Sequence, residues 1–301
     1  MSDILNTVYL GIIEGITEFL PISSTGHLLI AEHWLGERSE LFNVVIQAGA
    51  ILAIVLIYWQ RLLGLVTGWK QPENRDYAIK YCVSVLITLV LAFIATRLGF
   101  KLRDAVLPIA IAMLLGGVLI LIIERVVAPR PQLQAVTWNV VVWVGVAQVV
   151  AGIFPGTSRS AAAIFAAMLA GLTSRPAATE FAFLVGIPIM FAASGYEYLK
   201  SRHGGGVAVP EDWNALAIGF VVSGVVAFIS VKWLLHYVRS HRFTLFAWYR
   251  ILGGVALVVL LANGVFEEHD KVAGPVSHAT ADSGQHSALS PRLLTSNASQ
   301  R

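Results

Sequence analysis

The chain has 301 residues, of which 56% are hydrophobic and 13% are charged, and its mean hydropathy is +0.72. In soluble domains about a quarter of the residues are charged, so the composition predicts an all-α polytopic membrane protein. The formal net charge of +3 comes from scattered residues and argues against nucleic-acid binding. The single cysteine, Cys82, excludes a disulfide framework and a cysteine-based metal site. Its apolar surroundings predict a small buried side chain.

Six segments are apolar enough to cross a membrane, which takes about 20 residues. They are residues 42–59, 81–96, 106–123, 178–199, 216–235 and 248–261. Two further apolar stretches, 5–35 and 136–172, are interrupted by Pro, Gly, Ser and charged residues. Proline disfavours helix in the residue before it, and irregular backbone at membrane depth must lie inside protein or line a cavity. Each stretch is therefore predicted to be re-entrant, as two half-helices around a break, and the breaks are where a site is expected.

The two interrupted stretches share a pattern at a constant offset of 134 residues. The paired positions are Gly11 and Gly145, Glu14 and Gln148, Pro21 and Pro155, Ser23 and Thr157, and Ser24 and Ser158. About three spans follow each stretch, so the two copies would have inverted topology. We expect a single membrane domain over 1–266, with repeat one at about 1–128 and repeat two at about 135–264. The alternative is chance similarity. Residues 267–301 have the composition of a disordered tail.

The distribution of Lys and Arg between the loops favours placing both termini outside. Ten of these residues then lie in inner loops, namely Arg61, Lys70, Arg75, Lys80, Arg125, Arg130, Arg175, Lys232, Arg239 and Arg242. Six lie in outer loops, namely Arg38, Arg97, Lys101, Arg103, Lys200 and Arg202.

The first break follows two glutamates, Glu14 and Glu18, that share one helix face. Carboxylates so placed repel each other unless a cation or a proton lies between them. Charged groups in a membrane segment are costly and are candidates for function. The alternative is a pair at the membrane surface, or one bonded to a neighbouring helix.

After Pro21 come Ser23, Ser24 and Thr25, then a helical pattern that contains His27. Ser and Thr are favoured helix N-caps, and a helix N-terminus binds phosphate through free N–H groups. His27 lies one helical turn after Ser24, where an imidazole can activate a hydroxyl. An ordinary cap and a structural histidine are the alternatives.

The second break contains Thr157, Ser158 and Arg159. Arg159 is expected to be the basic residue set deepest among apolar neighbours. Arginine stays charged, and one guanidinium can bind two phosphate oxygens at once. An inverted repeat would place Arg159 opposite Glu18 and His27. A salt bridge to a glutamate, with no ligand, is the alternative.

The segment from Glu14 to His27 resembles the first signature of the undecaprenyl-diphosphatase family, which is linked to bacitracin resistance, and the segment from Pro155 to Ser160 resembles the second. The likeness covers residues 1–262 and includes the segment from Phe246 to Arg250. The resemblance implies removal of the terminal phosphate from undecaprenyl pyrophosphate for peptidoglycan synthesis. It also implies a divalent-cation requirement and a site on the outer side of the bacterial cytoplasmic membrane. The active-site positions it implies are Glu14, Glu18, Ser23, Ser24, Thr25, His27, Ser158 and Arg159.

These residues suggest a mechanism in which Ser24 attacks phosphorus and His27 accepts its proton. Attack by His27 or by water stays open. Glu14 and Glu18 would hold Mg²⁺ or Ca²⁺. Arg159 would bind phosphate, together with the hydroxyl groups at both breaks: Ser23, Thr25, Thr157 and Ser158.

Three other functions are compatible with parts of this pattern. An inverted-repeat transporter or a flippase of a polyprenyl phosphate would use the same broken helices, but it needs no activated hydroxyl. A membrane phosphatase of the acid-phosphatase-like type would need a later His-x-x-x-Asp pair, which the predicted membrane domain, 1–266, lacks. A purely structural membrane protein leaves the glutamates and Arg159 unexplained. Whether the chain forms a homodimer stays open.

Overall fold

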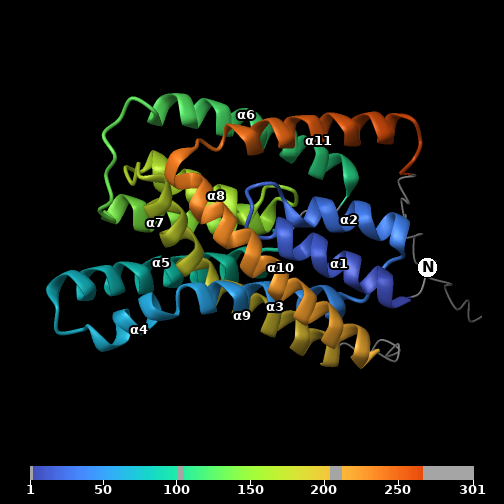
Figure 1. Ribbon diagram of the computed structural model, residues 1–301, viewed down its shortest axis with the longest axis horizontal. Coiled ribbons are helices and arrows are strands. Elements are labelled where there is room, and N and C mark those ends of the chain that lie inside the picture. Colours follow the sequence, from blue (N-terminus) through green and yellow to red (C-terminus); the bar gives the residue numbers. More distant parts are fainter. Residues whose placement is uncertain (1–2, 101–104, 204–211, 267–301) are drawn as a thin grey trace, which may run out of the picture. The chain divides into compact units, whose positions relative to one another are not determined.

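The computed structural model describes residues 3–100, 105–203 and 212–266, and within these ranges it contains eleven helices and no strand (Figure 1). In chain order the helices are α1 (Asp3–Thr17), α2 (Ser24–Leu35), α3 (Glu40–Ile57), α4 (Trp59–Thr67), α5 (Pro72–Arg97), α6 (Val106–Val127), α7 (Trp138–Ile153), α8 (Arg159–Leu169), α9 (Arg175–His203), α10 (Trp213–Ser240) and α11 (Thr244–Ala262). The predicted tail, 267–301, lies outside the described residues, and the preceding chain forms one compact unit, Met1–Glu267.

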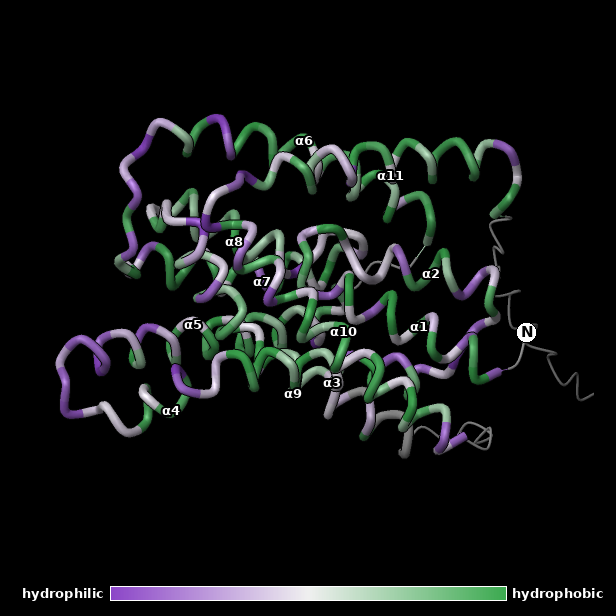
Figure 2. Tube along the Cα trace, viewed as in Figure 1, coloured by the Kyte–Doolittle hydropathy of each residue, from purple (hydrophilic) through white to green (hydrophobic). Residues whose placement is uncertain are grey.

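Six of these helices, α3, α5, α6, α9, α10 and α11, are long and apolar enough to cross a membrane. They coincide with the six predicted spans. Five of them extend beyond the predicted span, because polar residues continue the helix at its ends, whereas α3 ends at Ile57, two residues before the predicted end. The helix α5, for example, begins at Pro72, where a missing N–H costs nothing. Figure 2 shows hydrophobic residues along these helices and hydrophilic ones near several turns. The chain is thus an all-α multi-pass membrane protein.

Each interrupted stretch folds into two short helices that double back on themselves, α1 with α2 and α7 with α8. The amide of Asn6, near the start of α1, donates to the carbonyl of Leu35 at the end of α2, at 2.8 Å. In the second pair, the N–H of Leu133, before α7, donates to the Thr173 hydroxyl, after α8, also at 2.8 Å. Both breaks therefore lie at the far tip of a hairpin, as a re-entrant segment requires. Their depth in a bilayer stays a prediction.

Each half of the chain holds the broken helix of the other half through small residues. A Cβ at Gly15 of α1 would lie 2.7 Å from the carbonyl oxygen of Ser223 in α10. A Cβ at Gly145 of α7 would lie 3.0 Å from the carbonyl oxygen of Ser84 in α5. Close backbone contact of this kind is typical of helix packing in membranes. The two broken helices thus have corresponding partners, as the predicted inverted repeat requires, although the repeat itself stays a prediction.

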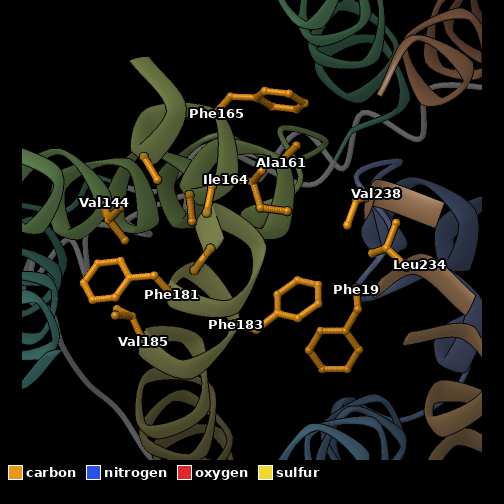
Figure 3. Close-up of a cluster of buried hydrophobic side chains, with 14 of the residues drawn as sticks. Phe19, Val144, Ala161, Ile164, Phe165, Phe181, Phe183, Val185, Leu234 and Val238 are labelled. Carbon is orange, nitrogen blue, oxygen red and sulfur yellow. The ribbon is translucent and has the colours of Figure 1, made fainter. Parts of the chain in front are cut away.

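The largest apolar core lies where α8 and α9 meet α7 and α10, as Figure 3 shows for Phe165, Phe181 and Phe183. Phe19, from the first break, packs edge-on against Phe183 with ring centroids 5.4 Å apart. This contact fixes the first break against the second half of the chain. Cys82 is exposed on α5, so the prediction that it is buried was wrong. Few residues of α5 are buried, and in a membrane an apolar side chain is equally stable facing lipid.

Candidate functional site

Both breaks end in a serine with strained backbone. Ser23 caps α2 with φ of 79°, and Ser158 caps α8 with φ of 65°, and no other non-glycine residue in the described ranges has a positive φ. Each side chain accepts a hydrogen bond from a backbone N–H in the first turn of its helix, as an N-cap does. Strain of this kind gathers at functional sites. The caps are 135 residues apart, whereas the prolines are 134 apart, because the second loop has an extra residue.

The two breaks form loops, residues 18–23 and 154–158. The first loop touches the start of α8, which follows the second loop, although 140 residues separate Leu20 from Ser160 in sequence. The hydroxyl of Ser160 donates to the carbonyl of Leu20 at 3.1 Å. The guanidinium Nη2 of Arg159 donates to Oε1 of Glu18 at 3.0 Å. The predicted meeting of Arg159 with Glu18 is therefore present in the structure, in the form of a salt bridge.

A cavity of about 180 Å³ lies between the loops. Six predicted site residues line it: Glu18, Ser23, Ser24, Thr25, Ser158 and Arg159. The first residues of α2 and α8 are among them, so two helix N-termini meet at one small space. Helix N-termini carry partial positive charge, which favours a phosphate group.

Glu18 links the hydroxyl of Ser24 to the guanidinium of Arg159. It is only 7% exposed, and its Oε2 accepts a hydrogen bond from Ser24 Oγ at 2.5 Å, while its Oε1 accepts from Arg159. A carboxylate in contact with a hydroxyl can take up its proton. The base that touches Ser24 in this structure is thus Glu18.

His27 points elsewhere, and the predicted contact between its ring and the Ser24 hydroxyl is not formed. Its Nδ1 lies 2.7 Å from the carbonyl oxygen of Ser23, and its Nε2 lies 2.6 Å from the hydroxyl of Tyr249. A carbonyl only accepts hydrogen bonds, so Nδ1 carries the proton that Ser23 receives. In the neutral ring Nε2 then accepts from Tyr249. The spacing of Ser24 and His27 placed them one turn apart, but other partners orient the imidazole.

Glu14 and Thr157 also lie outside the cavity lining. Glu14 is 1% exposed, one turn before Glu18, and its Oε2 is buried with no hydrogen-bond partner in the described part of the protein. Thr157 presents its carbonyl to Arg250. An orphaned carboxylate oxygen beside a second carboxylate suits a bound cation or a shared proton, so the pair fits the predicted metal role.

Arg250 is a residue that the sequence argument passed over. Its side chain is fully buried and donates only to backbone carbonyls, those of Pro21 and of Gly156 and Thr157 in the two loops, and those of Ala112 and Met113 in α6. The expectation that Arg159 is the most deeply set basic residue was wrong, because the Arg159 side chain is 26% exposed. The sequence feature that could have identified Arg250 is its position as an arginine inside the predicted span 248–261.

The sequence argument also passed over Tyr249, the residue next to Arg250. The segment from Phe246 to Arg250 entered the argument only through its resemblance to a family segment. An indole, a phenol and a guanidinium at the start of a span are ordinary interfacial residues. Only the contact of Tyr249 with His27 and the contacts of Arg250 with the loops show a link to the site.

Comparison with known proteins adds a family and close relatives. A family model described as the bacitracin resistance protein BacA matches residues 7–256. An undecaprenyl-diphosphatase of Rhizobium etli strain CFN 42 is 62% identical over 263 residues, which are 87% of this chain and 99% of that protein. An undecaprenyl-diphosphatase of Xanthomonas oryzae pv. oryzae is 54% identical over 261 residues, 87% of this chain and 98% of that protein. The family match spans both loops and α11 as far as residue 256.

Proposed function

The chain belongs to the bacitracin resistance protein BacA family, and from this membership and its site we infer that it is an undecaprenyl-diphosphatase embedded in a membrane. It hydrolyses the phosphoric anhydride of undecaprenyl pyrophosphate to the monophosphate and inorganic phosphate. The observation that carries this assignment is the hydrogen-bonded series from Ser24 through Glu18 to Arg159, at the meeting point of two helix N-termini.

The nucleophile in this proposal is Ser24. Its Oγ forms a bond to the terminal phosphorus, the bond to the bridging oxygen breaks, and the lipid monophosphate leaves with that oxygen and its electron pair. Glu18 takes the hydroxyl proton, since its Oε2 already accepts the hydrogen bond. Water then attacks the phosphorus of the phosphoserine, and the bond from phosphorus to Ser24 Oγ breaks. Ser24 Oγ takes back the proton that Glu18 held, the released phosphate keeps one proton of the water, and the other proton goes to solvent.

Positive charge around the phosphate is the second requirement of phosphoryl transfer. Arg159 has five N–H donors, of which one goes to Glu18, and its side chain lines the cavity. The N-termini of α2 and α8 add their partial charges, and the hydroxyls of Ser23, Thr25 and Ser158 add donors. Thr157 would contribute only through its backbone, which helps shape the second loop.

A divalent cation, Mg²⁺ or Ca²⁺, would be held by Glu14 and Glu18. When bound, it would neutralise charge on the phosphate oxygens. No group of three or more His, Cys, Asp or Glu side chains suited to a metal is present in the described ranges. Mg²⁺ commonly keeps one or two carboxylates together with water and substrate phosphates, so two glutamates are sufficient protein ligands.

The enzyme would act in the bacterial cytoplasmic membrane with its site facing the outer side. The loop charges support this orientation, and the apolar faces of the spans suit a polyprenyl chain. The product would return to peptidoglycan synthesis. Movement of the lipid across the bilayer is the second candidate function, because paired hairpins with tips that meet are also transporter architecture.

Phosphate release from undecaprenyl pyrophosphate by the detergent-purified protein tests the assignment. We expect activity with Mg²⁺ that is lost with EDTA, and losses of at least about a hundredfold in Ser24→Ala, Glu18→Gln and Arg159→Ala. Glu32→Gln is the matched control, since that glutamate bonds Asn43 away from the cavity. An inactive wild type that still binds the lipid would support the transporter instead.

The nucleophile is identified by trapping the phosphorylated enzyme. An acid-stable label that disappears in Ser24→Ala supports attack by Ser24. An acid-labile label that disappears in His27→Ala would transfer the role to His27, and turnover without any label would favour direct attack by water.

A further inference from the structure

A second cavity, of about 620 Å³, lies between the later part of α6 and the start of α11. Its apolar wall consists of Val118, Leu121 and Ile122 of α6. Val118 and Ile122 are 45% and 52% exposed, so this wall opens to the side of the molecule. Figure 1 shows α6 and α11 running next to each other along this face. In a membrane, lipid covers such a face.

The rim of this cavity is positively charged. Arg125 and Arg242 line it, both exposed, and neither side chain has a hydrogen-bond or ion-pair partner among the described residues. The acidic residue of the lining, Glu124, is already neutralised. Its two oxygens accept from Arg175 at 2.9 and 2.5 Å, and Oε1 also accepts from the N–H of Phe243. The two arginines are therefore free to bind an anion.

The cavity is separate from the phosphatase site. Arg125 lies in the last turn of α6, and Met113, which contacts Arg250, lies twelve residues earlier in the same helix. At 1.5 Å per residue the two positions are about 18 Å apart along the axis. An arginine at the end of a span lies near the lipid headgroups.

We propose that this cavity binds the phosphate of an anionic bilayer phospholipid, with an acyl chain along Val118 and Ile122. Guanidinium groups bind phosphate oxygens in pairs, and basic residues at the membrane surface attract anionic lipids. The apolar side wall explains why the ligand is a lipid that enters from the bilayer, rather than a phosphate from solution. The inference needs only a membrane-embedded chain and does not depend on the proposed phosphatase activity.

The test uses the full chain in nanodiscs of phosphatidylcholine with and without phosphatidylglycerol. Native mass spectrometry counts the lipids that stay bound, and thermal unfolding reports stabilisation. We expect the wild type to prefer phosphatidylglycerol. The double variant Arg125→Gln/Arg242→Gln should lose at least about tenfold of that preference, as expected when two charge-assisted contacts disappear.

The matched control is Arg130→Gln/Arg239→Gln, which removes the same charge from exposed residues outside the cavity. We expect this control to keep the preference. Equal loss in both double variants would reduce the effect to general attraction by basic loops and would overturn the site. A wild type with no preference would overturn it as well. A cooperative thermal unfolding transition in phosphatidylcholine nanodiscs shows that each variant is folded.

Discussion

The carboxylate of Glu18 accepts a hydrogen bond from Ser24 on one oxygen and from Arg159 on the other. Because the carboxylate is buried, both contacts act in a low dielectric, where hydrogen bonds to charge are strong. A buried charge without such partners would be costly. In the proposed mechanism, Glu18 therefore orients the Ser24 hydroxyl and also balances the charge of Arg159, which would bind the phosphate.

The hydroxyl of Tyr249 should influence turnover through the ring of His27. Tyr249→Phe removes the donor to Nε2 while keeping the stacked ring. Loss of one hydrogen bond predicts a kcat lower by on the order of two- to tenfold, with KM unchanged. Tyr249→Leu, which also removes the stacking, should be slower. Steady-state kinetics of phosphate release measures both.

Tyr9→Phe is the control for that measurement, because Tyr9 is an exposed tyrosine on α1. It should behave as the wild type does. A Tyr249→Phe enzyme with unchanged kcat would mean that the tyrosine only covers the histidine.

At the scale of elements, α11 connects the two loops to α6 through Arg250. Its guanidinium donates to carbonyls of both loops and of α6, and buried loop carbonyls, which have no partner within a helix, need such donors. A Cβ at Gly116 would lie 2.3 Å from the Arg250 guanidinium, so a glycine in α6 makes room for this side chain. The loops therefore depend on a helix that follows them in the chain.

Replacement of Arg250 should destabilise the loops and reduce activity together. Arg250→Met leaves several buried carbonyls without donors, at about 1–3 kcal/mol each, so we expect a loss of at least about 3 kcal/mol. Arg250→Lys keeps the charge with fewer donors and should lie between Met and wild type. Thermal unfolding in detergent measures the stability of the three proteins, and phosphate release measures their activity.

Arg239→Met serves as the control, since Arg239 is an exposed arginine in α10. Its midpoint of thermal unfolding should equal that of the wild type. An Arg250→Met protein with wild-type stability would show that the carbonyls find other partners and that the hydrogen bonds of Arg250 are not needed for stability.

At the scale of the whole molecule, close helix crossings join the two halves of the chain. A Cβ at Gly49 of α3 would lie 2.3 Å from the carbonyl oxygen of Phe220 in α10. That oxygen belongs to the backbone, so the helices themselves would have to separate. The crossing matters because α1, which carries Glu14 and leads directly into Glu18, also packs on α10.

Gly49→Ala should therefore lower stability by about 1–3 kcal/mol, the usual cost of overpacking. The expected change is a lower midpoint of thermal unfolding in detergent. Gly64→Ala in α4 is the matched control, since its added Cβ would have no neighbour within 4 Å. That change should be neutral or stabilising by up to about 1 kcal/mol, because alanine favours helix. If both variants unfold alike, the crossing is not tightly packed.

The sequence by itself determined the described helices other than α4. Span lengths depend on runs of apolar residues, and the breaks at 18–23 and 154–158 depend on Pro, Gly and Ser nearby in the chain. These are local properties, so both hairpins and all six spans were predictable. The motifs also named the residues around the cavity, since Glu18, Ser24 and Arg159 are unusual in an apolar chain.

The tertiary structure alone decided which of these residues meet and how. Ser24 and Glu18 are six residues apart and pair across the break, while His27, nearer to Ser24, turns to Tyr249, 222 residues away. Arg250 reaches Pro21 across 229 residues. Sequence spacing predicts neighbours within a helix, but the break changes the direction of the chain. Distant helices then supply the hydrogen-bond partners that orient each side chain, and no local pattern encodes them.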